Sequence, residues 1–264
     1  MILSVGEGLN SSCRSFAGAL LRRDADAVRR MIEKQVSSGA EYLDLNTAAV
    51  CGGDSGLEAE LAGWVSGMIP EETGIMLDSA DTGVLSSAHT ICAGHDVILN
   101  SVTLTRGIDE ISHYAAGHGF GVVLLPMKGG TVPESAEERA ENVRAGASKL
   151  IGAGVPAGSL YADMLVTPAV GGRGAEAVLS ALRMVKSSMP EIRTIIGLSN
   201  VSFGLPRRSA LNTAMMAAAV CVGLDAAIWD VTDQDVRSAA YAACVLSGKD
   251  DMCLEYTRYM RHSS

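Results

Sequence analysis

Residues 194–206 read TIIGLSNVSFGLP, and this stretch decides the fold that the sequence predicts. It opens with an apolar, β-branched run that is typical of a buried strand. The run then passes into Gly, Ser and Asn and ends at Pro206, which cannot continue a strand ladder. A helical pattern follows from about Arg207. Asn200 therefore lies where a buried strand ends, and in a barrel of parallel strands that end is the catalytic rim.

The same strand-then-helix unit recurs along the whole chain. Further strands are expected at residues 1–5, 42–46, 74–79, 96–101, 121–127, 160–163 and 224–230. Helices are expected at residues 24–38, 57–68, 82–93, 108–118, 135–153, 174–188, 210–222 and 233–246. Asp24, Ser135 and Asp233 are the expected N-caps. Eight units without a linker predict one closed (β/α)8 TIM barrel, a single domain over residues 1–264.

An open, doubly wound sheet is the alternative fold. A Gly-x-Gly-x-x-Gly turn after the first strand would favour it, and Gly6-Glu7-Gly8 begins in that way. Ser11 stands where the third glycine is needed, and the Glu7 carboxylate would repel a pyrophosphate.

The composition indicates a folded protein that does not bind nucleic acid or membranes. Hydrophobic residues make up 48% of the 264 residues, which is enough for a large core, and the net charge of −9 disfavours an anionic partner. The six cysteines form no Cys-x-x-Cys pair, so neither a zinc site nor a disulfide framework is expected. The N-terminus lacks the pattern of a signal peptide, and no run of about 18 apolar residues occurs. We therefore expect a cytoplasmic protein.

Polar residues gather at the predicted strand ends, where the barrel would bring them to one mouth. They are Glu7, Asn10, Asp44, Asn46, Asp78, Asn100, Asp163 and Asn200. The set holds no His for a zinc hydrolase. The one lysine at a predicted strand end, Lys128, lies beside two glycines and is expected in solvent rather than in a Schiff-base site. Asp44 and Asp78 could bind magnesium, but their spacing does not require it, and no bound metal is predicted.

Carboxylates and carboxamides together suit a flat, nitrogen-rich heterocycle. A carboxylate accepts two parallel N–H bonds from an amino-pyrimidine edge, and a carboxamide both donates and accepts. A pterin presents such an edge and also carries a nitrogen that can bear a methyl group. Each Asp or Asn taken singly has an ordinary alternative role as a helix cap or turn former.

Several segments resemble the pterin-binding barrel family, and most closely its methyltetrahydrofolate:corrinoid methyltransferases. The folate-binding module of cobalamin-dependent methionine synthase is similar. The segments are Gly6-Glu7-x-x-Asn10, Tyr42-Leu43-Asp44-Leu45-Asn46, Leu77-Asp78-Ser79, Asn100-Ser101, Tyr161-x-Asp163 and Gly197-Leu198-Ser199-Asn200-Val201-Ser202. One departure is Phe203, where some corrinoid-protein methyltransferases carry Gln.

The resemblance implies which residues act. Asp78, Asn100 and Asp163 would bind the pterin edge, Asn200 would lie near the methyl-bearing nitrogen, and Gly197 and Ser199 would shape the same wall. The other strand-end residues and Ser202 are possible contacts.

The resemblance also implies transfer of a methyl group between N-5 of tetrahydrofolate and the cobalt of a corrinoid (cobalamin). No corrinoid-binding motif is visible, so the corrinoid would be carried on a separate protein. Asn200 would donate a hydrogen bond to N-5, and Asp163 could deliver the proton through water. A homodimer is expected, with residues 215–220 as a candidate face. A dihydropteroate-synthase-like enzyme and a non-catalytic folate-binding protein are the alternatives.

Overall fold

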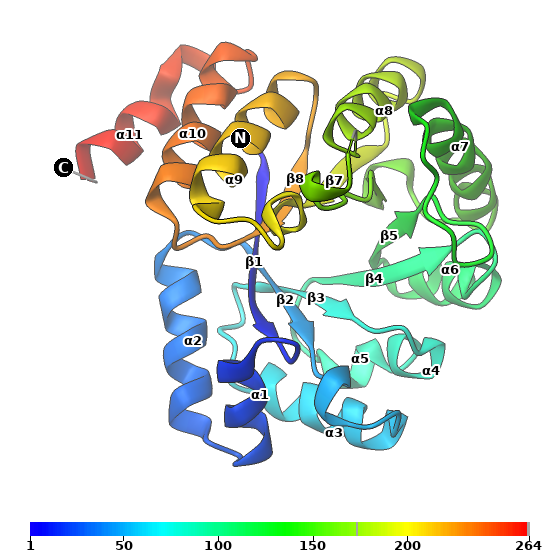
Figure 1. Ribbon diagram of the computed structural model, residues 1–264. Helices are drawn as coiled ribbons and strands as arrows, with labels where there is room; N and C mark the ends of the chain where they lie inside the picture. Colours follow the sequence, from blue (N-terminus) through cyan, green and yellow to red (C-terminus); the bar gives the residue numbers. More distant parts are fainter. Residues whose placement is uncertain (173, 263–264) are drawn as a thin grey trace.

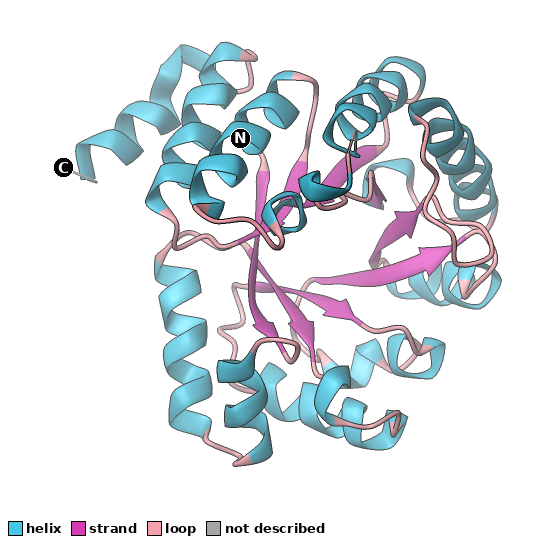
Figure 2. Cartoon of the chain, viewed as in Figure 1, coloured by secondary structure: helices cyan, strands magenta, loops and turns pink. Residues whose placement is uncertain are grey.

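Eight parallel strands close into a barrel in chain order in the computed structural model, which describes residues 1–172 and 174–262 (Figures 1 and 2). The strands are β1 (Leu3–Asn10), β2 (Tyr42–Asn46), β3 (Gly74–Asp78), β4 (Val97–Thr103), β5 (Gly121–Leu125), β6 (Leu160–Asp163), β7 (Arg193–Gly197) and β8 (Ala226–Trp229). The barrel closes because β1 pairs with both β2 and β8, for example Val5 with Tyr42 and with Ile228. This closure confirms the predicted TIM barrel and excludes the open sheet.

Helices surround the strands on the outside (Figure 2). They are α1 (Arg14–Leu21), α2 (Ala25–Ser37), α3 (Ser55–Ser66), α4 (Thr82–Leu85), α5 (Ala88–Ile91), α6 (Ile108–His118), α7 (Ala136–Gly152), α8 (Gly174–Ser188), α9 (Arg208–Cys221), α10 (Gln234–Leu246) and α11 (Leu254–His262). The three predicted N-caps are confirmed: the side chains of Asp24, Ser135 and Asp233 each accept a backbone N–H from the first turn. Within the described residues, no helix has the length and apolar character needed to span a lipid bilayer.

Several local predictions were wrong. Strands β5 and β8 are shorter than the predicted 121–127 and 224–230. The first strand does not end at Val5, because its pairing with β2 resumes beyond a bulge and carries it to Asn10. Helix α3, predicted over residues 57–68, begins at Ser55 because the Asp54 side chain caps it. The helix expected over 82–93 is two short helices, α4 and α5. The amphipathic α1 and α11 were not predicted.

The core has two parts, as a barrel with an outer helical layer requires. A small cluster fills the barrel interior: Val5, Met76, Ile98, Val123, Tyr161, Ile195 and Ala226. A larger core lies between strands and helices and includes Met215 and Met216, which are 5% and 0% exposed. The predicted dimer face is therefore wrong for these two residues, because buried side chains that fill the core cannot contact a partner.

The N-terminal end of the barrel is closed by structural contacts. Inside it, the Tyr42 hydroxyl donates to Asp96, and Arg193 donates to the Tyr161 hydroxyl at 2.6 Å. Beside it, the Asp225 carboxylate accepts from Lys186 Nζ at 2.9 Å and from the Thr194 backbone N–H at 2.9 Å. These polar groups bind one another, and the acids and amides predicted to form the site lie at the opposite, C-terminal end of the barrel.

Candidate active site

A cavity of about 770 Å³ opens at the C-terminal ends of the strands. It gathers most of the predicted site residues: Glu7, Asn10, Asp44, Asp78, Asn100, Asp163, Gly197, Ser199 and Asn200. Side chains alternate along a strand, so strand-end residues on the inner face point into the barrel mouth. The predicted gathering of distant residues at one mouth is therefore what the structure shows.

Asp44 and Asn100 form the deepest polar pair. Both side chains are buried, and Asn100 Nδ2 donates to Asp44 Oδ1 at 3.2 Å. This bond fixes the Asn100 amide with its Oδ1 left available as an acceptor. Burial raises the pKa of Asp44 well above its usual range, and the negative charge of Asp78 raises it further.

Asp78 is oriented in the same way by a neighbouring amide. Asn46 Nδ2 donates to Asp78 Oδ2 at 3.0 Å, so Asp78 Oδ1 is left for a ligand. Burial raises the pKa of Asp78 to about 6, although the bond from Asn46 works against this rise. Asp78 is therefore a carboxylate near neutral pH. Asn46 does not line the cavity itself but holds a residue that does.

Asp163 is the last residue of β6 and also lines the mouth. Its Oδ1 accepts the backbone N–H of Leu165 at 2.7 Å, so one carboxylate oxygen is used within the exit loop. Burial raises the pKa of Asp163 to about 6, although that bond and the positive charge of Arg139 lower it. A carboxyl group with this pKa exchanges protons readily near neutral pH.

Asn200 lies on the short 3₁₀ turn η4 (Leu198–Ser202) that follows β7. It is exposed, and a Cβ added to Gly197 would lie 3.0 Å from Asn200 Nδ2. The absence of a side chain at Gly197 is therefore what lets the amide lie over the end of β7. Beside it, Ser199 Oγ donates to Glu7 Oε1 at 2.7 Å. Burial raises the pKa of Glu7, and this bond opposes the rise.

Ser202 is fully buried and lies behind the wall rather than on it. Its hydroxyl donates to the Ser199 backbone oxygen at 3.2 Å and accepts from Arg208 Nε at 2.9 Å. Arg208 Nη2 also donates to the Ser199 oxygen at 2.7 Å. Ser202 and Arg208 thus brace the turn that carries Asn200. Ser202 was predicted as a possible contact of the pterin, but this placement puts it behind the residues that line the cavity.

The cavity also has a side that the strand-end pattern did not predict. It continues over the β1–α1 loop to α2, where Cys13, Met31, Lys34 and Gln35 line it, and Phe203 and Asp230 flank it. Lys34 belongs to an amphipathic helix, so its periodicity indicated only an exposed position. Lys128, by contrast, is exposed and outside the lining, as expected.

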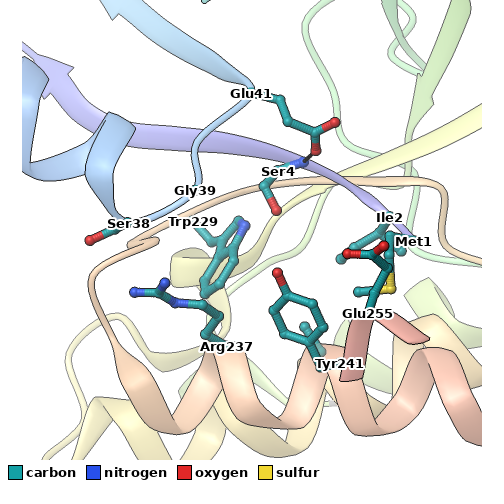
Figure 3. A pocket seen from close by; sticks show the side chains of 11 residues that line it. Met1, Ile2, Ser4, Ser38, Gly39, Glu41, Trp229, Arg237, Tyr241 and Glu255 are labelled. Carbon is teal, nitrogen blue, oxygen red and sulfur yellow. Dashed lines mark hydrogen bonds between the residues drawn. The ribbon is translucent and has the colours of Figure 1, made fainter. Parts of the chain in front are cut away.

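A second, smaller cavity of about 230 Å³ lies outside the barrel, between β1, β8 and α10 (Figure 3). Trp229 and Tyr241 contribute aromatic walls, and Ser4, Glu41 and Arg237 contribute polar groups. None of the predicted site residues lines it. The acid and amide chemistry therefore belongs to the mouth.

Asp44 and Asp78 are the two mouth residues that the sequence offered as possible magnesium ligands. In the described part of the chain, no three His, Cys, Asp or Glu side chains come together to hold a metal ion. Asp44 and Asp78 each pair with a carboxamide instead.

The family model for pterin binding enzymes matches residues 6–230. The chain belongs to the pterin-binding enzyme family. It is 25% identical to a methylcorrinoid:tetrahydrofolate methyltransferase of Eubacterium limosum, and the match covers 98% of this chain and 96% of that protein. It is 30% identical to a methionine synthase of Mycobacterium tuberculosis, over 86% of this chain but only 20% of that protein.

Solved structures of other pterin-binding enzymes share the barrel. A dihydropteroate synthase of Coxiella burnetii in complex with pteroic acid superposes with a TM-score of 0.70 at 16% identity, covering 94% of each chain. A dihydropteroate synthase of Clostridium difficile gives a TM-score of 0.67 at 16% identity, covering 93% of this chain and 97% of that one. At this identity the likeness shows the fold alone.

Proposed function

We propose that the protein is a methyltransferase that moves a methyl group between N-5 of tetrahydrofolate and the cobalt of a corrinoid carried on a separate protein. The observation that carries the proposal is that the residues expected to hold the pterin line one cavity: Asp78, Asn100, Asp163, Gly197, Ser199 and Asn200. The likeness to the Eubacterium limosum enzyme over nearly the full length supports it.

The floor of the mouth fits the pterin edge. Asn46 occupies one oxygen of Asp78, and Asp44 occupies the nitrogen of Asn100, so each site residue keeps one acceptor oxygen free. Asp78 and Asn100 are also directly paired neighbours in the β3–β4 register, and both line the cavity, so we propose that their free oxygens act side by side. Adjacent acceptors match the adjacent N–H donors of an amino-pyrimidine ring. We propose that they bind and orient the ring.

The methyl transfer requires proton movement at N-5. When 5-methyltetrahydrofolate gives up its methyl, N-5 keeps the electron pair of the broken bond and takes a proton; in the reverse direction it releases one. The bound corrinoid would supply the cobalt that accepts or gives the methyl group. Asn200, an uncharged donor, would hydrogen-bond to N-5, and Asp163 would exchange the proton through water because its pKa is about 6.

Methylcobalamin with tetrahydrofolate provides the test. We expect an enzyme-dependent loss of the methylcobalamin absorbance with formation of 5-methyltetrahydrofolate. Asn200→Ala should slow it by roughly 10- to 1000-fold, the scale of one positioned donor. Asn142→Ala is a matched control, because Asn142 lies on α7 and binds the Pro126 oxygen away from the cavity. An unchanged rate in Asn200→Ala would remove Asn200 from the mechanism.

Two other outcomes would replace the proposal. Condensation of a pterin pyrophosphate with 4-aminobenzoate would identify a dihydropteroate-synthase-like enzyme. Binding of tetrahydrofolate without methyl exchange would leave a folate-binding protein. Against the first, Arg208 is engaged by Ser199 and Ser202, and Asp230 adds a carboxylate where a pyrophosphate would need cations.

We further propose a cytoplasmic homodimer. Its contact face must be other than Met215 and Met216, since these side chains fill the core. Light scattering coupled to size-exclusion chromatography tests the dimer directly.

A further inference from the structure

Arg139 is a buried cation whose side chain donates hydrogen bonds to backbone carbonyl oxygens. It lies on α7, outside the barrel, and is 2% exposed. Its Nε donates to the Pro133 oxygen at 2.9 Å, and its Nη1 donates to the Met164 oxygen and, at 2.9 Å, to the Leu165 oxygen. Among the described residues, it forms no ion pair with a carboxylate. Burying an arginine in this way is costly, so a positive charge here calls for a reason beyond packing.

The carbonyls that Arg139 holds belong to the loop that orients Asp163. Leu165 has a φ of 53°, the left-handed region that a branched side chain seldom adopts. In this conformation its N–H points back to Asp163 Oδ1 at 2.7 Å. The guanidinium binds the oxygen of the same residue, so it fixes the peptide groups on both sides of the Leu165 Cα. Arg139 and Asp163 are thus connected through two backbone residues.

Charge makes a second connection. The positive charge of Arg139 acts on the Asp163 carboxylate and favours its ionised form. The other charged groups at the mouth are Glu7 on β1, Lys34 on α2, Asp44 on β2, Asp78 on β3, Arg208 on α9 and Asp230 after β8. Of these, the acids would oppose ionisation of Asp163. Arg208 is engaged in the η4 turn, and the cation that acts on Asp163 is Arg139 rather than Lys34.

We infer that Arg139 is a positioning residue for Asp163: it clamps the backbone of Met164 and Leu165 so that the carboxylate faces the mouth, and it supplies the positive charge that offsets that carboxylate. The inference concerns the site of the proposed methyltransferase and rests on that function only for its effect on turnover.

Two kinds of substitution separate the clamp from the charge. Arg139→Gln and Arg139→Met remove the charge; Arg139→Lys keeps it, but a single ammonium cannot reproduce the forked contact with three carbonyls. Arg144→Gln is the matched control, because Arg144 lies on the same helix, is exposed, and pairs only locally with Glu141.

Carbon-13 NMR of labelled Asp carboxyl groups then measures Asp163 directly, without folate or corrinoid, using Asp163→Asn for assignment. We expect the neutral variants to raise the titration midpoint of Asp163 by about one pH unit. Arg139→Lys keeps the charge, so it should raise the midpoint by less than the neutral variants do, and Arg144→Gln should not move it. An unmoved midpoint in a folded neutral variant would overturn the charge role. Failure of both neutral variants to fold would show that Arg139 serves the fold itself, and would overturn it too.

Turnover tests the clamp. Arg139→Lys should lower methyl transfer at least about tenfold, the scale of a displaced proton-transfer group. Wild-type turnover in this variant would refute the clamp. If the wild-type protein transfers no methyl group at all, the proposed function fails, whereas the NMR midpoints still decide whether Arg139 controls Asp163.

Discussion

Replacing Asp163 by Asn should make the folded protein more stable at neutral pH while impairing its chemistry. Burial raises the pKa of this carboxyl from 3.8 to about 6, so the folded state disfavours the charge that the unfolded chain carries freely. A rise of about two pH units, at about 1.4 kcal/mol each, corresponds to a cost of about 3 kcal/mol once the group is ionised in both states. Asn keeps an oxygen for the Leu165 N–H and removes the charge.

The pH dependence gives the prediction its sign. Between about pH 4 and pH 6 the folded wild-type protein holds a proton on Asp163 that the unfolded chain has lost, so this group contributes less stability as the pH rises through that window. The advantage of Asp163→Asn should therefore be about 1 kcal/mol near pH 4.5 and about 3 kcal/mol near pH 7.5.

Urea denaturation of both proteins at the two pH values measures this difference, provided that the m-values agree. A variant that is less stable than the wild type at pH 7.5 would refute the reasoning. So would an advantage that does not change with pH, because the cost would then not arise from the ionised carboxylate. Methyl transfer measured on the same samples should fall, as expected when a destabilising group is kept for function.

Three further outcomes are expected. Gly197→Ala should lower methyl transfer roughly tenfold without unfolding the protein, because the new Cβ would lie 3.0 Å from Asn200 Nδ2 and displace that amide; equal rates would show that the placement of the amide is not limiting. Asp78→Asn should weaken tetrahydrofolate binding by roughly 10- to 100-fold, measured by calorimetry, and wild-type affinity would contradict its role at the pterin edge. Asp225→Asn should destabilise the protein by about 2–4 kcal/mol at neutral pH. Burial alone would raise the pKa of Asp225, but the hydrogen bonds from Lys186 and from the Thr194 backbone, together with the positive charges of Lys249 and Lys186, outweigh burial and lower the pKa. This loss of stability should shrink as the pH falls below about 4. Chemical denaturation at two pH values measures it, and a loss of equal size at both would contradict the prediction.

The sequence was enough to predict the barrel and most of its mouth. Parallel strands covered on both faces need continuous apolar runs such as 121–125, and such runs are visible without a structure. Alternation along β2 placed Tyr42 and Asp44 on the inner face, and Asp78 and Asn200 were recognisable as polar residues at the ends of apolar runs. Closing eight such units brings their C-terminal ends together, so a local pattern that marks a strand end also predicts a position at the mouth.

Which side chain reaches the cavity was decided by the tertiary structure alone. Asn46 and Ser202 follow the same strand-end pattern as their neighbours, yet each lies one layer back and holds a lining residue. Lys34 reaches the mouth from a helix whose periodicity marks it only as exposed. Arg139 meets the loop after Asp163 across more than twenty residues of chain, and its role rests on contacts with backbone carbonyls, which every residue possesses. Side-chain identity and spacing fix the faces of strands and helices, whereas contacts to the backbone of distant loops depend on how those elements pack.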